Sequence, residues 1–201
     1  MDWKELESAV AVCENCGLCE TRTNTVFGTG DQKADWLFVG EAPGYNEDKQ
    51  GEPFVGRAGN KLNQWLEKVG LSRESVYIAN TLKCRPPNNR DPLPDEALNC
   101  RPYLRRQIEL LQPKIIIPVG RIAAQLLLRT DTPIGQLRKQ CHFYEKTDIP
   151  VVVTYHPAYI LRNPAKESEV ISDLLFAHKI LGLTEQVEQE TQEPTADLLE
   201  W

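Results

Sequence analysis

The sequence predicts a three-layer α/β/α fold with a central, mostly parallel, four-stranded sheet. Short runs that are apolar throughout alternate along the chain with longer segments of helical periodicity. Strands with apolar side chains on both faces are typical of parallel sheets, because helices then cover both faces. The chain has 201 residues, 41% of them hydrophobic, which suffices for one domain with a sizeable core. We expect that domain to span residues 1–183.

The first half of the chain is expected to form two helices and two strands. Residues 2–12 have a helical pattern, and a cysteine-rich loop separates them from the strand DWLFVG, which ends at Gly40. A second helix is predicted over residues 58–69, because its large apolar side chains fall on one face and Gly70 follows it. The next strand, SVYIAN, ends at Asn80.

The middle of the chain begins with a polar, proline-rich loop, KCRPPNNRDPLP. Helical segments follow over residues 95–111, and Pro102 is expected to break or restart the helix there. The apolar run KIIIPVG predicts the third strand, and RIAAQLLLR predicts the helix after it.

The last part of the chain supplies the fourth strand and a final helix. The strand is PVVVTY, which runs into the loop HPAYILRNP, and an amphipathic helix follows over residues 167–181. Residues 184–201 are acidic and are predicted to be a disordered tail. The end of this tail, ADLLEW, mixes acidic and apolar residues and could dock on a partner protein, although a disordered end is the simpler prediction.

Composition and charge exclude few classes of ligand. The net charge is −6, but residues 184–201 hold six acidic and no basic residues, so the remaining chain is balanced. A balanced body can still present a local basic surface, and nucleic acid therefore remains a possible partner. The first residues do not resemble a signal peptide, and no apolar run is long enough to span a bilayer. We expect a cytoplasmic protein, in which cysteines are thiols or metal ligands.

Polar side chains follow three of the predicted strands. Glu41 follows the first strand, Asn80 ends the second, and His156 follows the fourth. Ligands of open α/β sheets bind outside the carboxyl ends of the strands, so we expect these side chains to meet there. Each of them also has an ordinary interpretation as a turn or structural residue. The Asn80 amide can pair with a nucleobase edge, and Phe54, in a glycine-rich loop, can stack on a base or pack in the core.

Basic residues cluster near this expected site. They can contact phosphate groups or form ordinary solvated surface. The residues are Lys83, Arg85, Arg90, Arg101, Arg105, Arg106 and Arg162.

Four of the six cysteines form a candidate metal site, namely Cys13, Cys16, Cys84 and Cys100. Four thiolates can hold zinc or a 4Fe-4S cluster, and the missing second C-x2-C pair slightly disfavours zinc. Cys19 is near enough to the first pair to compete as a ligand, whereas Cys141 is expected to be a buried thiol. Six unligated core cysteines are the structural alternative.

Several segments, in this order, resemble the family-4 uracil-DNA glycosylases, an iron–sulfur type of repair enzyme: GEAPGYNED, GEPFVGRAGNKL, NTLKCRPPNNRDPLPDE and HPAYILRNP. The resemblance covers about residues 13–181. It implies a uracil-DNA glycosylase-like fold and a monomeric hydrolase that flips deoxyuridine out of DNA. The enzyme would cleave the N-glycosidic bond and release uracil in base excision repair. The resemblance also implies that the four cysteines bind a structural 4Fe-4S cluster.

The resemblance implies roles for the residues around the base. Phe54 would stack on uracil, Asn80 would read its O4 and N3–H edge, and His156 would face O2. Glu47 would crowd the uracil C5 position against thymine. Breaking the bond leaves negative charge on uracil, which His156 and nearby amides can stabilise.

Other residues would serve the sugar and the DNA backbone. Glu41 and the Ala42 backbone would lie on the water and sugar side, and Leu161 would fill the gap left by the flipped base. Arg85 and Arg162 would lie near phosphates. The better-known uracil glycosylases carry an aspartate at the position of Ala42, so we expect Glu41 to stabilise the cationic sugar or orient water.

Two other classes of function fit the same residues. One is a non-catalytic iron–sulfur nucleic-acid-binding protein of the same superfamily, which would hold DNA without releasing a base. The other is a redox-sensing iron–sulfur regulator with a vestigial pocket.

Overall fold

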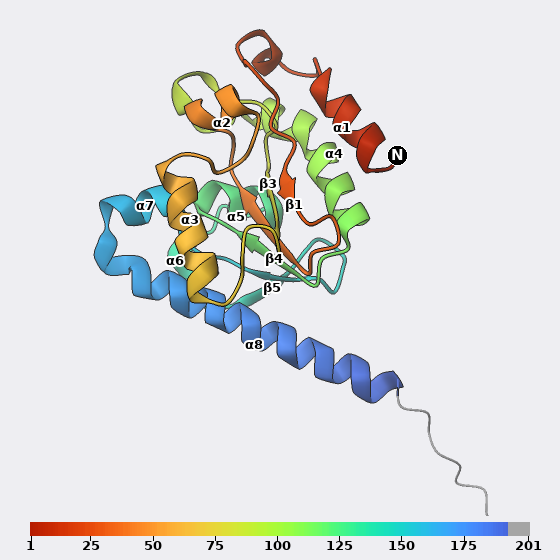
Figure 1. Ribbon diagram of the computed structural model, residues 1–201, viewed down its shortest axis with the longest axis vertical. Coiled ribbons are helices and arrows are strands. Elements are labelled where there is room, and N and C mark those ends of the chain that lie inside the picture. Colours follow the sequence, from red (N-terminus) through yellow and green to blue (C-terminus); the bar gives the residue numbers. More distant parts are fainter. Residues whose placement is uncertain (193–201) are drawn as a thin grey trace, which may run out of the picture.

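The computed structural model describes residues 1–192, with side chains described up to Gly182. A single six-stranded sheet forms the centre of the domain, in the order β1-β3-β2-β4-β6-β5 (Figure 1). The four inner strands are parallel, as predicted, and the two edge strands pair antiparallel. The strands are β1 (Thr29–Gly30), β2 (Trp36–Gly40), β3 (Tyr77–Asn80), β4 (Ile115–Pro118), β5 (Cys141–Phe143) and β6 (Pro150–Val152).

Helices cover both faces of this sheet, which confirms the three-layer prediction (Figure 1). The helices are α1 (Trp3–Ala11), α2 (Tyr45–Gln50), α3 (Arg57–Lys68), α4 (Pro94–Leu111), α5 (Arg121–Leu128), α6 (Ile134–Leu137), α7 (Pro157–Arg162) and α8 (Glu167–Gln192). Side chains of β2 alternate between the two faces: Trp36 and Phe38 pack with α3 and α8, whereas Leu37 and Val39 pack with α4 and α5.

Local sequence signals account for most helix boundaries. Asp2 and Glu5 form a capping box at the start of α1, with the Asp2 carboxylate accepting the Glu5 N–H at 2.9 Å. Gly51 adopts a left-handed conformation and ends α2. None of the helices within residues 1–192 combines the length and the apolar character that a bilayer crossing requires.

Four elements differ from the sequence-based expectations. The sheet has six strands rather than four, because β1 and β5 are very short and carry no apolar run. Pro102 does not break α4, which is continuous across it although proline removes one of the hydrogen bonds of the helix. The segment after His156 is the short helix α7 rather than a loop. The last helix includes residues 184–192 of the predicted tail, and residues 193–201, including ADLLEW, lie outside the described residues.

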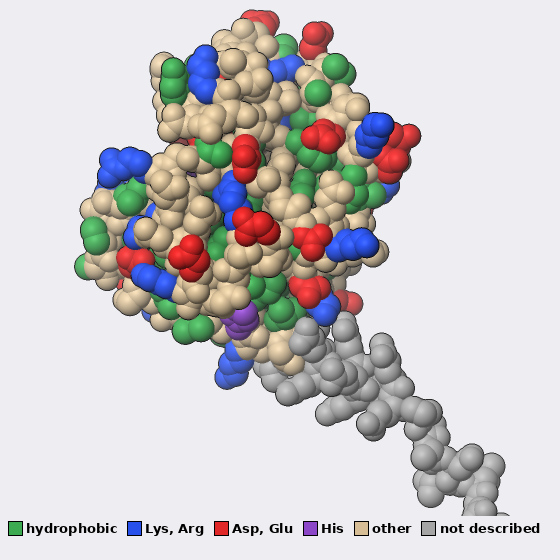
Figure 2. Space-filling model, in the orientation of Figure 1, with side chains coloured by type: hydrophobic (Ala, Val, Ile, Leu, Met, Phe, Trp, Pro, Cys, Tyr) green, Lys and Arg blue, Asp and Glu red, His purple; other side chains and the backbone are tan. Residues whose placement is uncertain are grey.

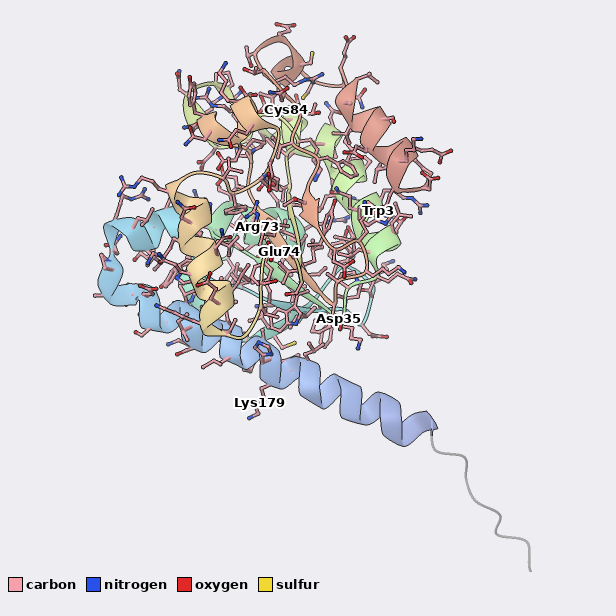
Figure 3. The ribbon with its side chains drawn as sticks, in the orientation of Figure 1. Trp3, Asp35, Arg73, Glu74, Cys84 and Lys179 are labelled. Carbon is pink, nitrogen blue, oxygen red and sulfur yellow. The ribbon has the colours of Figure 1, made fainter. Side chains whose placement is uncertain are left out.

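The parallel strands end together at one edge of the sheet. Gly40 at the end of β2 is in register with Asn80 at the end of β3. Figure 3 shows Asp35, which precedes β2, at one end of the sheet and Cys84, which follows β3, at the other. The cysteine site and the loops after the strands therefore lie at the carboxyl end, where ligands of such sheets bind.

Candidate functional site

A pocket of about 570 Å³ lies at this carboxyl edge, on the side where α2 faces α3 and α7 (Figure 1). Its volume is within the usual range for small-molecule sites. Loops after β2, β3 and β6 meet there, although they are far apart in the sequence. Seven residues predicted for the site line it: Glu41, Ala42, Glu47, Phe54, Asn80, His156 and Arg162.

Gly40 allows two of these side chains to lie over the end of β2. A Cβ atom at position 40 would stand 2.3 Å from Asn80 Oδ1 and 2.7 Å from the Phe54 ring. Asn80 is only 2% exposed, and among the side chains that the structure describes, up to residue 182, none forms a hydrogen bond with its amide. None of the described side-chain nitrogen or oxygen atoms is both fully buried and unpaired, so the Asn80 amide opens onto the pocket that it lines and is available to a ligand there.

Phe54 is held in an unfavourable backbone conformation. Its φ is 53°, in the left-handed region that aromatic residues rarely occupy. Glu47 Oε1 accepts the N–H groups of Val55 and Gly56 at 3.0 and 3.2 Å, and Arg73 Nη1 donates to the Phe54 carbonyl at 3.2 Å. Strain that the surroundings maintain in this way is typical of ligand sites. The buried Phe54 ring is 5.9 Å from the His156 ring, centroid to centroid.

His156 is fixed in one protonation state. It caps α7, and its Nδ1 accepts the Ala158 N–H at 3.1 Å. Burial, with a smaller contribution from Arg162, lowers the pKa of His156 to about 4. The ring is therefore neutral at pH 7, and since Nδ1 is an acceptor, Nε2 carries the proton. Gly120, at φ 102°, makes room for this residue, because a Cβ there would lie 2.9 Å from His156 Cβ.

Glu41 has a carboxyl group that titrates near neutral pH. Its carbonyl accepts hydrogen bonds from Thr81 Oγ1 at 2.5 Å and from the Leu82 N–H at 3.0 Å, which fixes the turn after β2. Burial, and then the nearby Asp91 carboxylate, raise the pKa of Glu41 to about 7, while Arg121 opposes them. Arg121 pairs with Asp91 at 3.0 Å. A carboxyl group with such a pKa in a pocket is typical of catalytic sites.

The four predicted cysteines line one small cavity behind this turn, namely Cys13, Cys16, Cys84 and Cys100. Cys19 and Cys141 are not among the residues that line it, and Cys141 is half-buried rather than buried. Leu18, Leu82 and Ala42 pack around the thiols, so the cavity adjoins the turn that carries Glu41. Among the side chains that the structure describes, no three potential ligands are placed to hold a single metal ion.

Thiol chemistry at this cavity is influenced by nearby cations. Burial raises the pKa of Cys100 to about 11, although Lys83 acts in the opposite direction. Burial also raises the pKa of Cys84, which Arg22 opposes from Nη1, 3.4 Å from Cys84 Sγ. The same nitrogen donates to the Cys13 carbonyl at 2.6 Å.

The residues predicted to contact DNA lie around the pocket mouth. Arg162 is exposed at the end of α7, and Leu161 beside it is half-buried, next to Arg57 and Lys61 in a shallow hollow. The Arg85 guanidinium lies 5.2 Å from the centre of the exposed Tyr45 ring. Sequence analysis missed Tyr45, whose only signal is an aromatic residue in a polar turn beside the site.

Of the other predicted basic residues only Arg90 lines the pocket, and most of the rest lie away from it, contrary to the sequence-based interpretation. Lys83 is 1% exposed and so cannot contact phosphate. Arg90 forms two hydrogen bonds with Glu96, at 2.8 and 2.6 Å, at the start of α4. Arg101 and Arg105 line a separate hollow between α4 and α5, and Arg106 binds Glu109 and the Met1 carbonyl. Acidic and basic side chains are interspersed over the face seen in Figure 2, in keeping with the balanced charge of the body.

Comparison with known proteins identifies relatives over most of the chain. Residues 27–175 match the model of the uracil DNA glycosylase superfamily. The type-4 uracil-DNA glycosylase of Archaeoglobus fulgidus is 46% identical over 176 residues, which are 85% of this chain and 88% of that protein. The type-4 enzyme of Thermotoga maritima is 41% identical, over 79% of this chain and 82% of its own. A type-5 uracil-DNA glycosylase of Pyrobaculum aerophilum is 27% identical, over 73% of this chain and 71% of its own.

Proposed function

The chain belongs to the uracil DNA glycosylase superfamily, among its type-4 enzymes, and from this premise we propose that the pocket binds deoxyuridine flipped out of DNA. The protein is a uracil-DNA glycosylase, a hydrolase that removes uracil from DNA during repair. The observation that carries the assignment of the pocket is the amide of Asn80, which lies beside the Phe54 ring and has no hydrogen-bond partner among the described side chains.

Asn80 and Phe54 recognise the base. The amide of Asn80 offers a donor and an acceptor in one plane, which match O4 and N3–H of uracil. Cytosine has an amino group in place of O4 and a bare N3, so both contacts fail. Phe54 stacks on the base and is held by Glu47, whose Oε1 accepts two amides of the same loop. Because Glu47 also lines the pocket, it closes the space beside C5, where thymine carries a methyl group.

His156 stabilises the leaving uracil. Its neutral ring donates from Nε2 to O2, where negative charge develops as the glycosidic bond breaks. The hydrogen bond from this neutral ring strengthens in the transition state, because negative charge grows on O2 while the proton stays on Nε2. One such donor, positioned in advance, is worth about 3–4 kcal/mol of transition-state stabilisation.

Glu41 acts on the sugar side. Its carboxylate stabilises the positive charge on the deoxyribose and orients the attacking water, in the manner of glycosidase carboxylates. Ala42, the next residue, has no group that could activate water. Only the ionised form of Glu41 can stabilise this positive charge, and that form appears as the pH rises through about 7.

The four cysteines are suited to a 4Fe-4S cluster. They bring four thiols from three segments of the chain to one cavity with apolar neighbours, and four thiolates are the ligand set that holds such clusters. When bound, the cluster would cross-link the loop after α1 to the loop after β3 and to α4. Cys13, Cys16, Cys84 and Cys100 would hold it directly behind the catalytic turn, so we assign it a structural role.

The DNA backbone lies along the pocket mouth. Arg162 and Arg85 contact phosphates on either side of the pocket, and Leu161 enters the gap left by the flipped nucleotide. The exposed ring of Tyr45, next to Arg85, offers a further surface on which a base can stack. A monomeric state and a cytoplasmic location stay predictions, the second supported by six free thiols.

The proposal is tested with purified protein and oligonucleotides that carry a single uracil, in single strands and opposite guanine. Treatment with alkali after incubation should break the strand at the uracil position, because only an abasic site is alkali-labile. The matched oligonucleotide with thymine should stay intact. A protein that binds the uracil strand but leaves no alkali-labile site would instead be the non-catalytic nucleic-acid-binding member.

A further inference from the structure

Lys83 is a buried cation that has no carboxylate partner in the part of the chain whose side chains are described. The side chain is 1% exposed, between the end of β3 and α4. Its Nζ donates to the Phe27 carbonyl at 3.2 Å, the Asn80 carbonyl at 2.9 Å and Gln107 Oε1 at 2.6 Å. All three acceptors are neutral, and Lys83 forms no salt bridge with the side chains that the structure describes, up to residue 182. Hydrogen bonds alone do not offset the cost of burying a charge, which normally requires a counter-charge.

The cysteine cavity is the place from which that counter-charge can come. Lys83 lines this cavity and precedes Cys84, and its own N–H donates to Cys100 Sγ at 3.2 Å. Arg22 approaches from the Cys13 side, 3.4 Å from Cys84 Sγ. Two basic residues therefore border the cysteine cavity, Lys83 through its backbone N–H and Arg22 through Nη1, and the thiols that they border must lose their protons to act as ligands.

We propose that Lys83 is the buried counter-charge of the four-cysteine centre and the link between that centre and the base-reading residue Asn80. This inference rests on the proposed 4Fe-4S cluster. Four thiolates give the cluster and its ligands a net negative charge, and the ammonium of Lys83 balances part of it in a medium of low dielectric constant. Arg22 does the same from the other side.

The link to Asn80 follows from the second hydrogen bond of the same ammonium. Lys83 Nζ holds the Asn80 carbonyl, and the Asn80 side chain turns into the pocket from that backbone. Loss of the cluster would leave the ammonium uncompensated and the end of β3 less firmly held. The cluster thus supports base recognition through Lys83, without touching the substrate.

Replacement of the charge tests the inference. Lys83→Met keeps most of the volume and removes the ammonium, and Lys179→Met, at an exposed position on α8 far from Cys84 (Figure 3), is the matched control. Iron per chain, the rate at which a chelator bleaches the visible absorbance, and the reduction potential of the cluster are measured for each. We expect Lys83→Met to bleach about 10- to 100-fold faster than wild type, because outer-shell partners of metal sites have effects of this size. Its potential should also fall, because a missing positive charge disfavours the reduced cluster.

A merely structural lysine would lower the melting temperature without moving the potential. Lys83→Met that keeps wild-type iron, bleaching rate and potential overturns the inference. If Lys83→Met does not fold, Gln107→Glu tests the inference instead, because a carboxylate at position 107 would compete with the cluster for Lys83. Faster bleaching and a lower reduction potential in Gln107→Glu support the inference, and unchanged values overturn it. A wild-type protein without iron overturns both the cofactor and this inference, whereas excision of uracil by that same preparation would still uphold the glycosylase.

Discussion

Gly40→Ala should disable the pocket while the domain stays folded. The added Cβ would stand 2.3 Å from Asn80 Oδ1, and ordinary van der Waals contact begins at 3.4 Å, so the base-reading amide must move by about 1 Å. The same Cβ would stand 2.7 Å from the Phe54 ring, so the stacking surface moves as well. A displacement of about 1 Å in a substrate-positioning group can slow a reaction by about 100-fold. Extra volume in a packed region costs about 1–3 kcal/mol of folding free energy, which the domain should tolerate.

Single-turnover excision of uracil from a single-stranded oligonucleotide measures the effect, with thermal unfolding measured on the same samples. Gly135→Ala is the control, because a Cβ at that position in α6 meets nothing within 4 Å. We expect Gly40→Ala to be about 100-fold slower than this control, with a cooperative unfolding transition retained. Excision within about threefold of the control would refute the geometry assigned to Asn80 and Phe54.

Three further predictions concern the chemistry and the DNA contacts. The single-turnover rate should rise as the pH passes through about 7, because Glu41 deprotonates there. Glu41→Gln should remove this pH dependence and slow excision by about 100-fold or more. Near wild-type cleavage by this variant would exclude a role for the carboxylate. His156→Ala should excise uracil about 100- to 1,000-fold more slowly than wild type. The midpoint of its pH–rate curve should stay near 7, because the pKa of His156 is about 4 and lies well below that pH. A shifted midpoint would contradict the neutral role of His156. Arg162→Ala should weaken binding of an uncleavable uracil oligonucleotide and reduce the slope of log K against log salt by about 1. Arg106→Ala, on α4, should leave that slope unchanged.

The sequence was sufficient to predict the inner part of the fold. The four parallel strands are apolar on both faces, because helices cover both faces of the sheet. Each of these strands is therefore a continuous apolar run, which can be recognised in a single sequence. The edge strands β1 and β5 are set by pairing with their neighbours, and no run of residues marks them. The helix α7 was missed because Pro157 after His156 resembles a turn, although proline is also favoured at the first position of a helix.

The candidate site was predictable where topology determines position. Glu41, Asn80 and His156 follow strands that end at one edge, so the pocket could be inferred before any distance was known. Gly40 and Gly120 could not be found in this way, because the atoms they lack matter only once Asn80 and His156 are placed.

Burial of charge was the main source of error. Lys83 stands in a polar, basic loop, and nothing in its neighbours distinguishes it from a solvated lysine. Asp48, a charged residue of α2 for which the sequence carries no sign of burial either, is 2% exposed, and its Oδ1 accepts the Thr23 N–H at 2.8 Å. Both residues are buried because distant segments close over them, which single-chain patterns do not encode.

The reading of uracil by Asn80 is tested most directly by comparing release of free uracil from DNA by the wild-type protein and by Asn80→Ala. Loss of a paired contact to a base edge is worth about 1–3 kcal/mol, so the variant should be about 5- to 150-fold slower in a single turnover, with an unchanged melting temperature. Equal rates for the two proteins, or a wild type that binds uracil-containing DNA and releases no uracil, would contradict the function assigned to this pocket.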